Sequence, residues 1–108
     1  MLSKHQELLN EFSLCIDEER YYDAHEALEE IWYPRRFEDN NEMKLLKGFI
    51  NAAVSFELIK RSRDNPSKIA WRNYLKYRPL LYKLSSPFLN DYHSLARKVE
   101  HIYYKKTF

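Results

Sequence analysis

The chain contains three side chains of kinds common in functional sites, spaced as on one face of a helix: His25, Glu29 and Trp32. Residues at positions i, i+4 and i+7 lie on the same side of an α-helix, within side-chain reach of one another. An imidazole and a carboxylate placed in this way can bind a divalent metal, or the carboxylate can orient the imidazole as a general base. The spacing predicts a site on this helix but specifies no reaction.

The next predicted helix should complete this site. A connection of about seven residues favours antiparallel packing, and this register places His25 opposite Asn51 and Glu29 opposite Lys47 and Gly48. Glycine inside a helix costs about 1 kcal/mol relative to alanine. We therefore expect Gly48 to let the two helices approach closely, so that the polar residues meet around it.

One interpretation of the site is a divalent metal centre, and zinc, iron or manganese would suit its mixed ligands. The residues assigned to it are His25 and Glu29 as ligands, with Glu26, Asn51 or Glu57 as the third, and a pocket lined by Tyr22, Trp32, Lys47 and Gly48.

Two other interpretations of the same residues stay open. In one, His25 is a general base that Glu29 orients. In the other, the pair is a buried structural network with no catalytic role, because buried polar groups need hydrogen-bond partners whether or not they have a function. Whether the protein is an enzyme is therefore undecided at this stage, and a non-catalytic protein-interaction module is the alternative to a polar or metal site.

The elements that position the site are predicted to be helices. Only one glycine occurs in 108 residues, and apolar residues recur with helical rather than alternating period. We predict an all-α fold, a single-domain antiparallel bundle of about five helices over residues 1–108. The predicted helices span residues 3 to about 19, about 21 to 33, 40 or 41 to about 63, 65 to 79, and 86 toward the C-terminus.

The charges are divided unevenly between the two halves of the chain. Residues 1–54 carry twelve Asp and Glu against six Lys and Arg, and residues 55–108 carry four against twelve. Such a division can mark a nucleic-acid or anionic-membrane surface, or it can let the two halves attract each other or two copies associate head to tail. Because the cations are spread along two predicted helices, we expect attraction between the halves or between copies rather than nucleic-acid binding.

Other features concern compartment and partners. Cys15 is the only cysteine, and the first twenty residues lack the apolar segment of a signal peptide, so we expect a cytoplasmic protein without a membrane segment. The aromatic residues at the end of the chain predict a contact with a second copy, a homodimer, or with another protein. They are Tyr103, Tyr104 and Phe108.

The motif His25-xxx-Glu29-xx-Trp32 resembles the signature of a bacterial and archaeal family known as domain of unknown function 309. The segments around it also resemble the family, with Tyr22-Asp23-Ala24 as the lead-in and residues 47–54 as a second block, and the match covers about residues 19–75. The resemblance implies an all-helical bundle and a metal-binding signature. The chain departs from the family pattern at Asn51, where glutamine is usual, at Glu57, where many members have histidine, and at Ile69-Ala70, where glycine and alanine are common.

Overall fold

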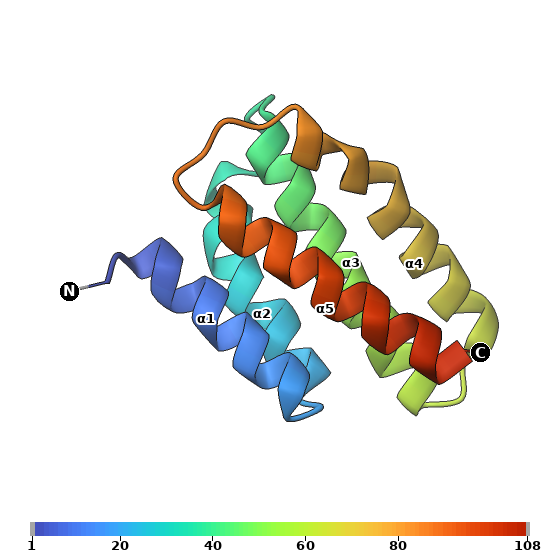
Figure 1. The fold of residues 1–108 in the computed structure, drawn as a ribbon. Coiled ribbons are helices and arrows are strands. Elements are labelled where there is room, and N and C mark those ends of the chain that lie inside the picture. The colour runs from blue at the N-terminus through green and yellow to red at the C-terminus, as the bar shows by residue number, and fades with distance from the viewer. Residues whose placement is uncertain (1, 108) are drawn as a thin grey trace.

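The computed structural model describes residues 2–107 and confirms the all-α prediction, with no strand in this range. Five α-helices and two short 3₁₀ helices follow one another along the chain (Figure 1). They are α1 (Lys4–Asp17), α2 (Tyr21–Trp32), η1 (Tyr33–Arg35), α3 (Asn41–Lys60), α4 (Asp64–Tyr77), η2 (Arg78–Tyr82) and α5 (Leu89–Thr107). None of the described helices is long and apolar enough to cross a bilayer.

Local capping signals define the starts of two helices. Ser3 Oγ accepts a hydrogen bond from the backbone N–H of Gln6 at the start of α1. Asn40 Oδ1 accepts one from the backbone N–H of Met43 at 2.8 Å at the start of α3. Both side chains satisfy donors that the first helical turn leaves unpaired, which is the reason these residues favour helix starts.

Proline effects are visible in the second half of the chain. Helix α4 ends at Tyr77, and Pro79 lies in the 3₁₀ helix η2 that follows, as expected for a residue without a backbone donor. Helix α5 begins at Leu89, three residues later than predicted, after Ser86 Oγ has accepted a hydrogen bond from the backbone N–H of Phe88.

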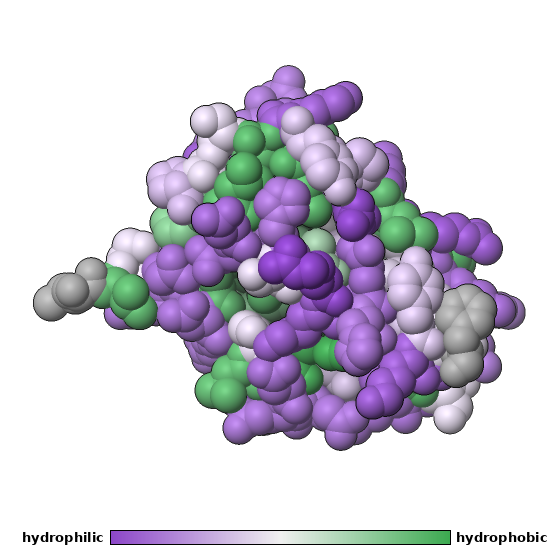
Figure 2. Space-filling view, in the orientation of Figure 1, coloured by the Kyte–Doolittle hydropathy of each residue, from purple (hydrophilic) through white to green (hydrophobic). Residues whose placement is uncertain are grey.

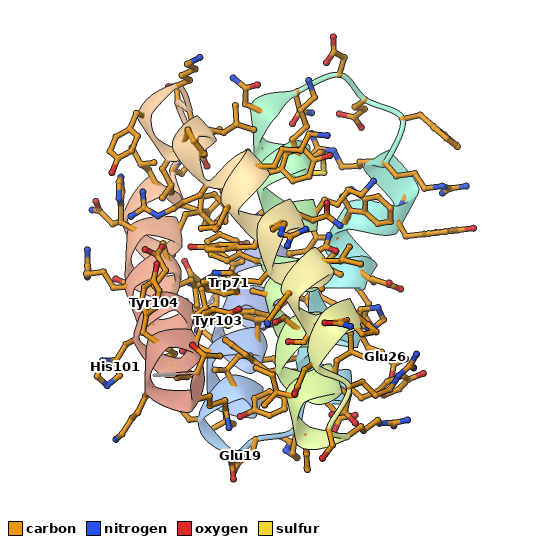
Figure 3. The ribbon with its side chains drawn as sticks, turned by 90° about the vertical axis from the view of Figure 1, so that its right-hand side faces the viewer. Glu19, Glu26, Trp71, His101, Tyr103 and Tyr104 are labelled. Carbon is orange, nitrogen blue, oxygen red and sulfur yellow. The ribbon has the colours of Figure 1, made fainter. Side chains whose placement is uncertain are left out.

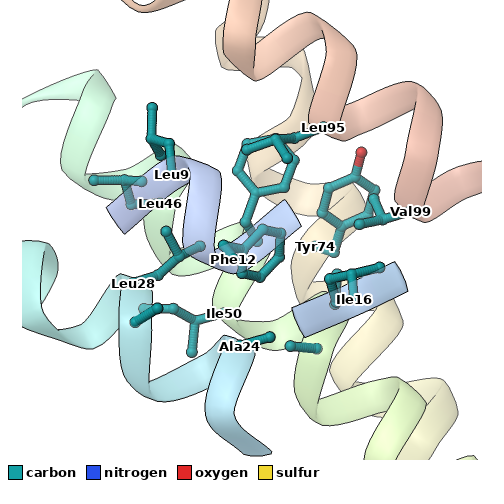
Figure 4. Close-up of a cluster of buried hydrophobic side chains, with 14 of the residues drawn as sticks. Leu9, Phe12, Ile16, Ala24, Leu28, Leu46, Ile50, Tyr74, Leu95 and Val99 are labelled. Carbon is teal, nitrogen blue, oxygen red and sulfur yellow. The ribbon is translucent and has the colours of Figure 1, made fainter. Parts of the chain in front are cut away.

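Helix α3 is the centre of the bundle. It packs between α2 and α4, α1 packs on α2, and α5 crosses in front of α3 (Figure 1). Side chains from all five helices meet in one core, including Phe12, Leu28, Ile50, Tyr74 and Val99 (Figure 4). Helix α3 consequently buries residues around most of its circumference rather than along one stripe.

The packing of α3 on α4 corrects the prediction for the glycine. A Cβ added at Gly48 would lie 3.1 Å from Tyr77 Cβ and 3.6 Å from the backbone oxygen of Tyr74, both on α4. Two turns further along α3, Ser55 Oγ lies 3.0 Å from Ser67 Oγ of α4 in the buried interface between the same helices. The small residues of α3 therefore admit α4, and the prediction that Gly48 brings α2 close to α3 is wrong.

A polar cluster joins α1, α3 and α5 at one end of the bundle. His5 Nε2–H donates to the Tyr92 hydroxyl at 2.8 Å, and that hydroxyl donates to the carboxylate of Glu42. The imidazole also stacks on Phe88 with a ring separation of 4.0 Å. Desolvation lowers the pKa of His5 below its usual 6.5, although the nearby Glu42 carboxylate opposes the shift. His5 is therefore part of the packed structure.

Candidate functional site

The imidazole–carboxylate pair predicted on α2 is formed. His25 Nε2 and Glu29 Oε1 are 2.6 Å apart, and the two side chains are 24% and 39% exposed. Because both residues belong to one helix, one turn apart, their separation is fixed by local geometry alone. The pair is thus present before any tertiary contact is considered, and the surrounding helices decide what it faces.

The second nitrogen of the ring is in an unusual position. His25 Nδ1 is buried and has no hydrogen-bond partner among residues 2–107. When Nε2–H donates to Glu29, a neutral imidazole carries its lone pair on Nδ1. A buried polar atom without a partner costs roughly 1–3 kcal/mol, and no side chain among residues 2–107 satisfies this nitrogen.

A cavity of about 300 Å³ lies beside this pair, between α2 and α3. Its α2 wall contains Tyr21, Tyr22 and His25, with the Tyr22 and His25 rings 5.8 Å apart. Its α3 wall includes the half-buried side chains of Val54 and Leu58. We refer to this cavity as the α2–α3 pocket.

Charged residues stand at the edge of the α2–α3 pocket. Arg61, Arg63 and Glu57 also line it. Arg61 Nε donates to Glu57 Oε1 at 2.9 Å, whereas Arg63 is exposed and makes no ion pair within the described chain. The edge therefore has a net positive charge beside largely apolar walls.

The three candidates for a third metal ligand are placed differently from one another. Glu26 is exposed and lines a separate shallow hollow with Glu29, whereas Glu57 reaches the α2–α3 pocket but is paired with Arg61. Asn51 faces α4, where its Oδ1 accepts a hydrogen bond from Asn73 at 3.4 Å. No group of three His, Cys, Asp or Glu residues with metal-binding geometry occurs between residues 2 and 107.

Two of the other residues predicted to line the pocket, Trp32 and Lys47, line a second hollow instead. Lys47 Nζ lies 5.7 Å from the centre of the Trp32 ring. A cavity of about 370 Å³ at this point is lined by Trp32, Lys47, Arg36, Phe37 and Tyr77 among others. The structure thus divides the predicted residues, with Tyr22, His25 and Glu57 at one end of α2 and Trp32 and Lys47 at the other.

Sequence reasoning missed five residues of the α2–α3 pocket. Tyr21 neighbours Tyr22 on α2, and Arg63 directly precedes α4. Val54 and Leu58 of α3 and Arg61, the C-cap of α3, recur at i, i+4 and i+7. The spacing was a usable signal, because these positions share one face of α3. The register placed Asn51 opposite His25, and the actual neighbours lie about one turn further along α3.

The aromatic residues near the C-terminus are only partly available to a partner. Tyr103 is buried and stacks on Trp71 of α4, with ring centres 4.0 Å apart. Tyr104 is 47% exposed, and Phe108 lies outside the described residues.

The fold and the polar pair together define a small helical-bundle protein with a pocket beside an imidazole–carboxylate pair. A family model described as a domain of unknown function (DUF309) matches residues 9–70. This is more than half of the 108-residue chain, and the chain therefore belongs to the DUF309 family. No curated protein and no solved structure matches the chain.

Proposed function

We propose that the protein binds a small organic molecule in the α2–α3 pocket, with the His25–Glu29 pair as its polar recognition group. The observation that carries this proposal is the position of the pair. An imidazole held at 2.6 Å by a carboxylate lies in the wall of a cavity of about 300 Å³. Pockets for small ligands begin at about this volume and combine apolar walls with a few convergent polar groups.

The lining of the pocket indicates the class of ligand. Tyr22, Val54 and Leu58 offer ring and aliphatic surface, and Arg61 and Arg63 stand at the edge. Guanidinium groups recognise carboxylate, sulfonate and phosphate oxygens through charge-assisted hydrogen bonds. A molecule with an apolar body of one or two rings and one anionic group matches both features.

The polar pair would act on a second group of this ligand. Glu29 is the more exposed partner, and exchanging its hydrogen bond to the imidazole for one to water costs about 0.5–1.5 kcal/mol. The carboxylate can therefore rotate away at little cost, after which the imidazole of His25 is available to a ligand hydroxyl or carbonyl. Access of a bound molecule to the imidazole is also the first requirement for acid–base catalysis by His25.

The experiment uses 8-anilino-1-naphthalenesulfonate, an aromatic anion whose fluorescence rises in apolar surroundings. We expect saturable binding to the folded protein and at least a tenfold weaker affinity in Val54→Trp, which fills the pocket. The matched control is Ile69→Trp, because Ile69 lies on α4, is 58% exposed and does not line the pocket.

Thermal unfolding checks that both variants are folded before the titration. If Val54→Trp binds the probe as tightly as the wild type, or if Ile69→Trp weakens binding equally, the α2–α3 pocket is not the site.

A divalent metal such as zinc, iron or manganese at His25 and Glu29 is the second candidate. The specific observation in its favour is that two donor atoms of suitable type already lie side by side. The described residues supply no third ligand in place, so such an ion would take further ligands from water or from a bound molecule.

Elemental analysis of protein purified without a histidine tag tests the metal, with His25→Ala as the comparison. A stoichiometric metal that is lost in His25→Ala supports the metal site. Absence of metal together with strong destabilisation of His25→Ala supports a structural network, and the protein would then be an interaction module rather than a binding or catalytic one.

A further inference from the structure

The segment formed by α4, η2 and α5 has an excess of uncompensated positive charge. Residues 64–107 contain nine Lys and Arg against three Asp and Glu. Three of the cations lie within 4.0 Å of a carboxylate, in the pairs Arg78–Glu100, Lys98–Asp17 and Lys106–Glu19. The other six are exposed and make no ion pair within residues 2–107: Lys68, Arg72, Lys76, Lys83, Arg97 and Lys105.

This distribution argues against mutual neutralisation of the two halves of the chain. Within residues 2–107, only Lys98 and Lys106 of the basic half pair with carboxylates of the acidic half, at Asp17 and Glu19. The six cations of residues 64–107 that make no ion pair within the described chain face solvent, so their charge is available to a partner. Figure 2 shows the face on which α5 lies in front, and this face is mostly hydrophilic.

The α4 side of this charged surface is defined by contacts with α5. Trp71 and Tyr103 stack in parallel at 4.0 Å and close the boundary between the two helices (Figure 3). Arg72 follows Trp71, is exposed, and lies near enough to Tyr103 for its charge to oppose the rise that burial causes in the pKa of that hydroxyl. Lys68, one turn earlier on α4, lines a hollow together with Tyr103. Both cations therefore border the α4–α5 boundary.

The α5 side carries aromatic and basic residues along one face. His93, Arg97 and Tyr104 are spaced i, i+4 and i+11, which places them on the same side of the helix. Tyr104 is 47% exposed and contacts Trp71 edge-on at 6.5 Å. At the other end, Tyr82 is 71% exposed and lies 6.1 Å from the His93 ring. We call this row of residues, together with Lys68 and Arg72, the α4–α5 track.

We propose that the α4–α5 track binds single-stranded nucleic acid. Cations without carboxylate partners attract a phosphate backbone, and the side chains of Tyr82 and Tyr104, which are 71% and 47% exposed, offer aromatic surface to unpaired bases. Stacking of this kind requires bases that are not already stacked in a duplex, so the aromatic residues favour a single strand over double-stranded DNA.

The site is separate from the α2–α3 pocket. No residue of the α4–α5 track lines the α2–α3 pocket. Figure 3 shows His101, on the same helix as Arg97, and Glu26, next to His25 on α2, pointing outward on opposite sides of the molecule. A mutation that abolishes binding of nucleic acid to the α4–α5 track should consequently leave binding of a small molecule to the α2–α3 pocket intact, and the reverse should also hold.

The first measurement is fluorescence anisotropy with a fluorescein-labelled 12-nucleotide oligo(dT). With about four phosphate contacts and a slope of about −0.7 per contact for single strands, the affinity should fall about fiftyfold between 50 and 200 mM salt. A 12-base-pair duplex of mixed sequence should bind at least tenfold more weakly at equal salt.

Two charge-matched double variants locate the contact. Arg72→Gln with Arg97→Gln should weaken oligo(dT) binding at least tenfold and reduce the magnitude of the salt slope by about 1.4. Arg36→Gln with Lys44→Gln removes the same charge from the region around η1 and the start of α3. This control should bind within about twofold of the wild type.

A third variant tests stacking without removing charge. Tyr104→Leu keeps an apolar contact with Trp71 and should weaken binding about tenfold while leaving the salt slope unchanged. The proposal is overturned if both double variants lose affinity equally, since the attraction is then non-specific. It is also overturned if the duplex binds as well as the single strand, or if vesicles containing anionic phospholipid bind and the oligonucleotide does not.

Discussion

Replacement of Gly48 by alanine should destabilise the protein, although alanine is the better helix former. In an isolated helix the change would gain about 1 kcal/mol. Here the added Cβ would lie 3.1 Å from Tyr77 Cβ, well inside the 3.5–4.0 Å at which carbon atoms attract each other. Tyr77 Cβ is bonded directly to the main chain of α4 and cannot rotate away.

The size of the effect follows from these two opposed contributions. Overpacking of a well-packed interface costs roughly 1–3 kcal/mol, and the propensity gain offsets about 1 kcal/mol of this. We expect Gly48→Ala to lower the free energy of unfolding by about 1 kcal/mol, and the melting temperature of a chain of this length by about 4 °C. Urea unfolding followed by circular dichroism measures the first quantity.

A double-mutant cycle with Tyr77→Gly isolates the contact. Removal of the opposing Cβ should leave only the propensity term, so Gly48→Ala in the Tyr77→Gly background should stabilise by about 1 kcal/mol. The coupling energy between the two positions is then about 2 kcal/mol. If Gly48→Ala stabilises the wild-type protein by about 1 kcal/mol, the close approach of α3 and α4 at this glycine is not real.

Three further predictions concern buried polar groups. Because burial lowers the pKa of His5, the unfolded chain binds more protons than the folded one below about pH 6.5. The free energy of unfolding should therefore fall with decreasing pH. Urea titrations at pH 7.5 and 5.5 should show a smaller fall for His5→Gln than for the wild type. If the free energy of unfolding falls equally in both proteins, titratable groups other than His5 cause the pH dependence. Ser67→Ala removes a donor to the backbone oxygen of Ser55 at 3.0 Å in a buried interface and should cost about 1–2 kcal/mol in the same assay; no loss would mean that water replaces the bond. Tyr74→Phe removes the hydroxyl that donates to the carboxylate of Glu100 at 2.6 Å and should cost about 1.5–3 kcal/mol, whereas an unchanged free energy of unfolding would show that Glu100 is satisfied by other donors.

The sequence alone determined the features that depend on neighbouring residues. Ser3 and Asn40 cap their helices, and Pro79 lies outside a regular α-helix, because capping and proline geometry act within one turn. The His25–Glu29 pair was predictable for the same reason, since a four-residue spacing on a helix fixes the distance between two side chains.

Tertiary packing decided which surface each residue meets. Gly48 faces α4 rather than α2, and Asn51 faces Asn73 rather than His25. Helix α3 is buried around most of its circumference, so its sequence pattern contains no single apolar stripe from which the rotation about its axis can be read. The predicted register of α3 against α2 was therefore wrong by about one turn. It placed Asn51 opposite His25, whereas Val54 and Leu58 line the pocket beside His25. Rotation and register depend on how all five helices share one core, and that information is distributed over residues far apart in the chain.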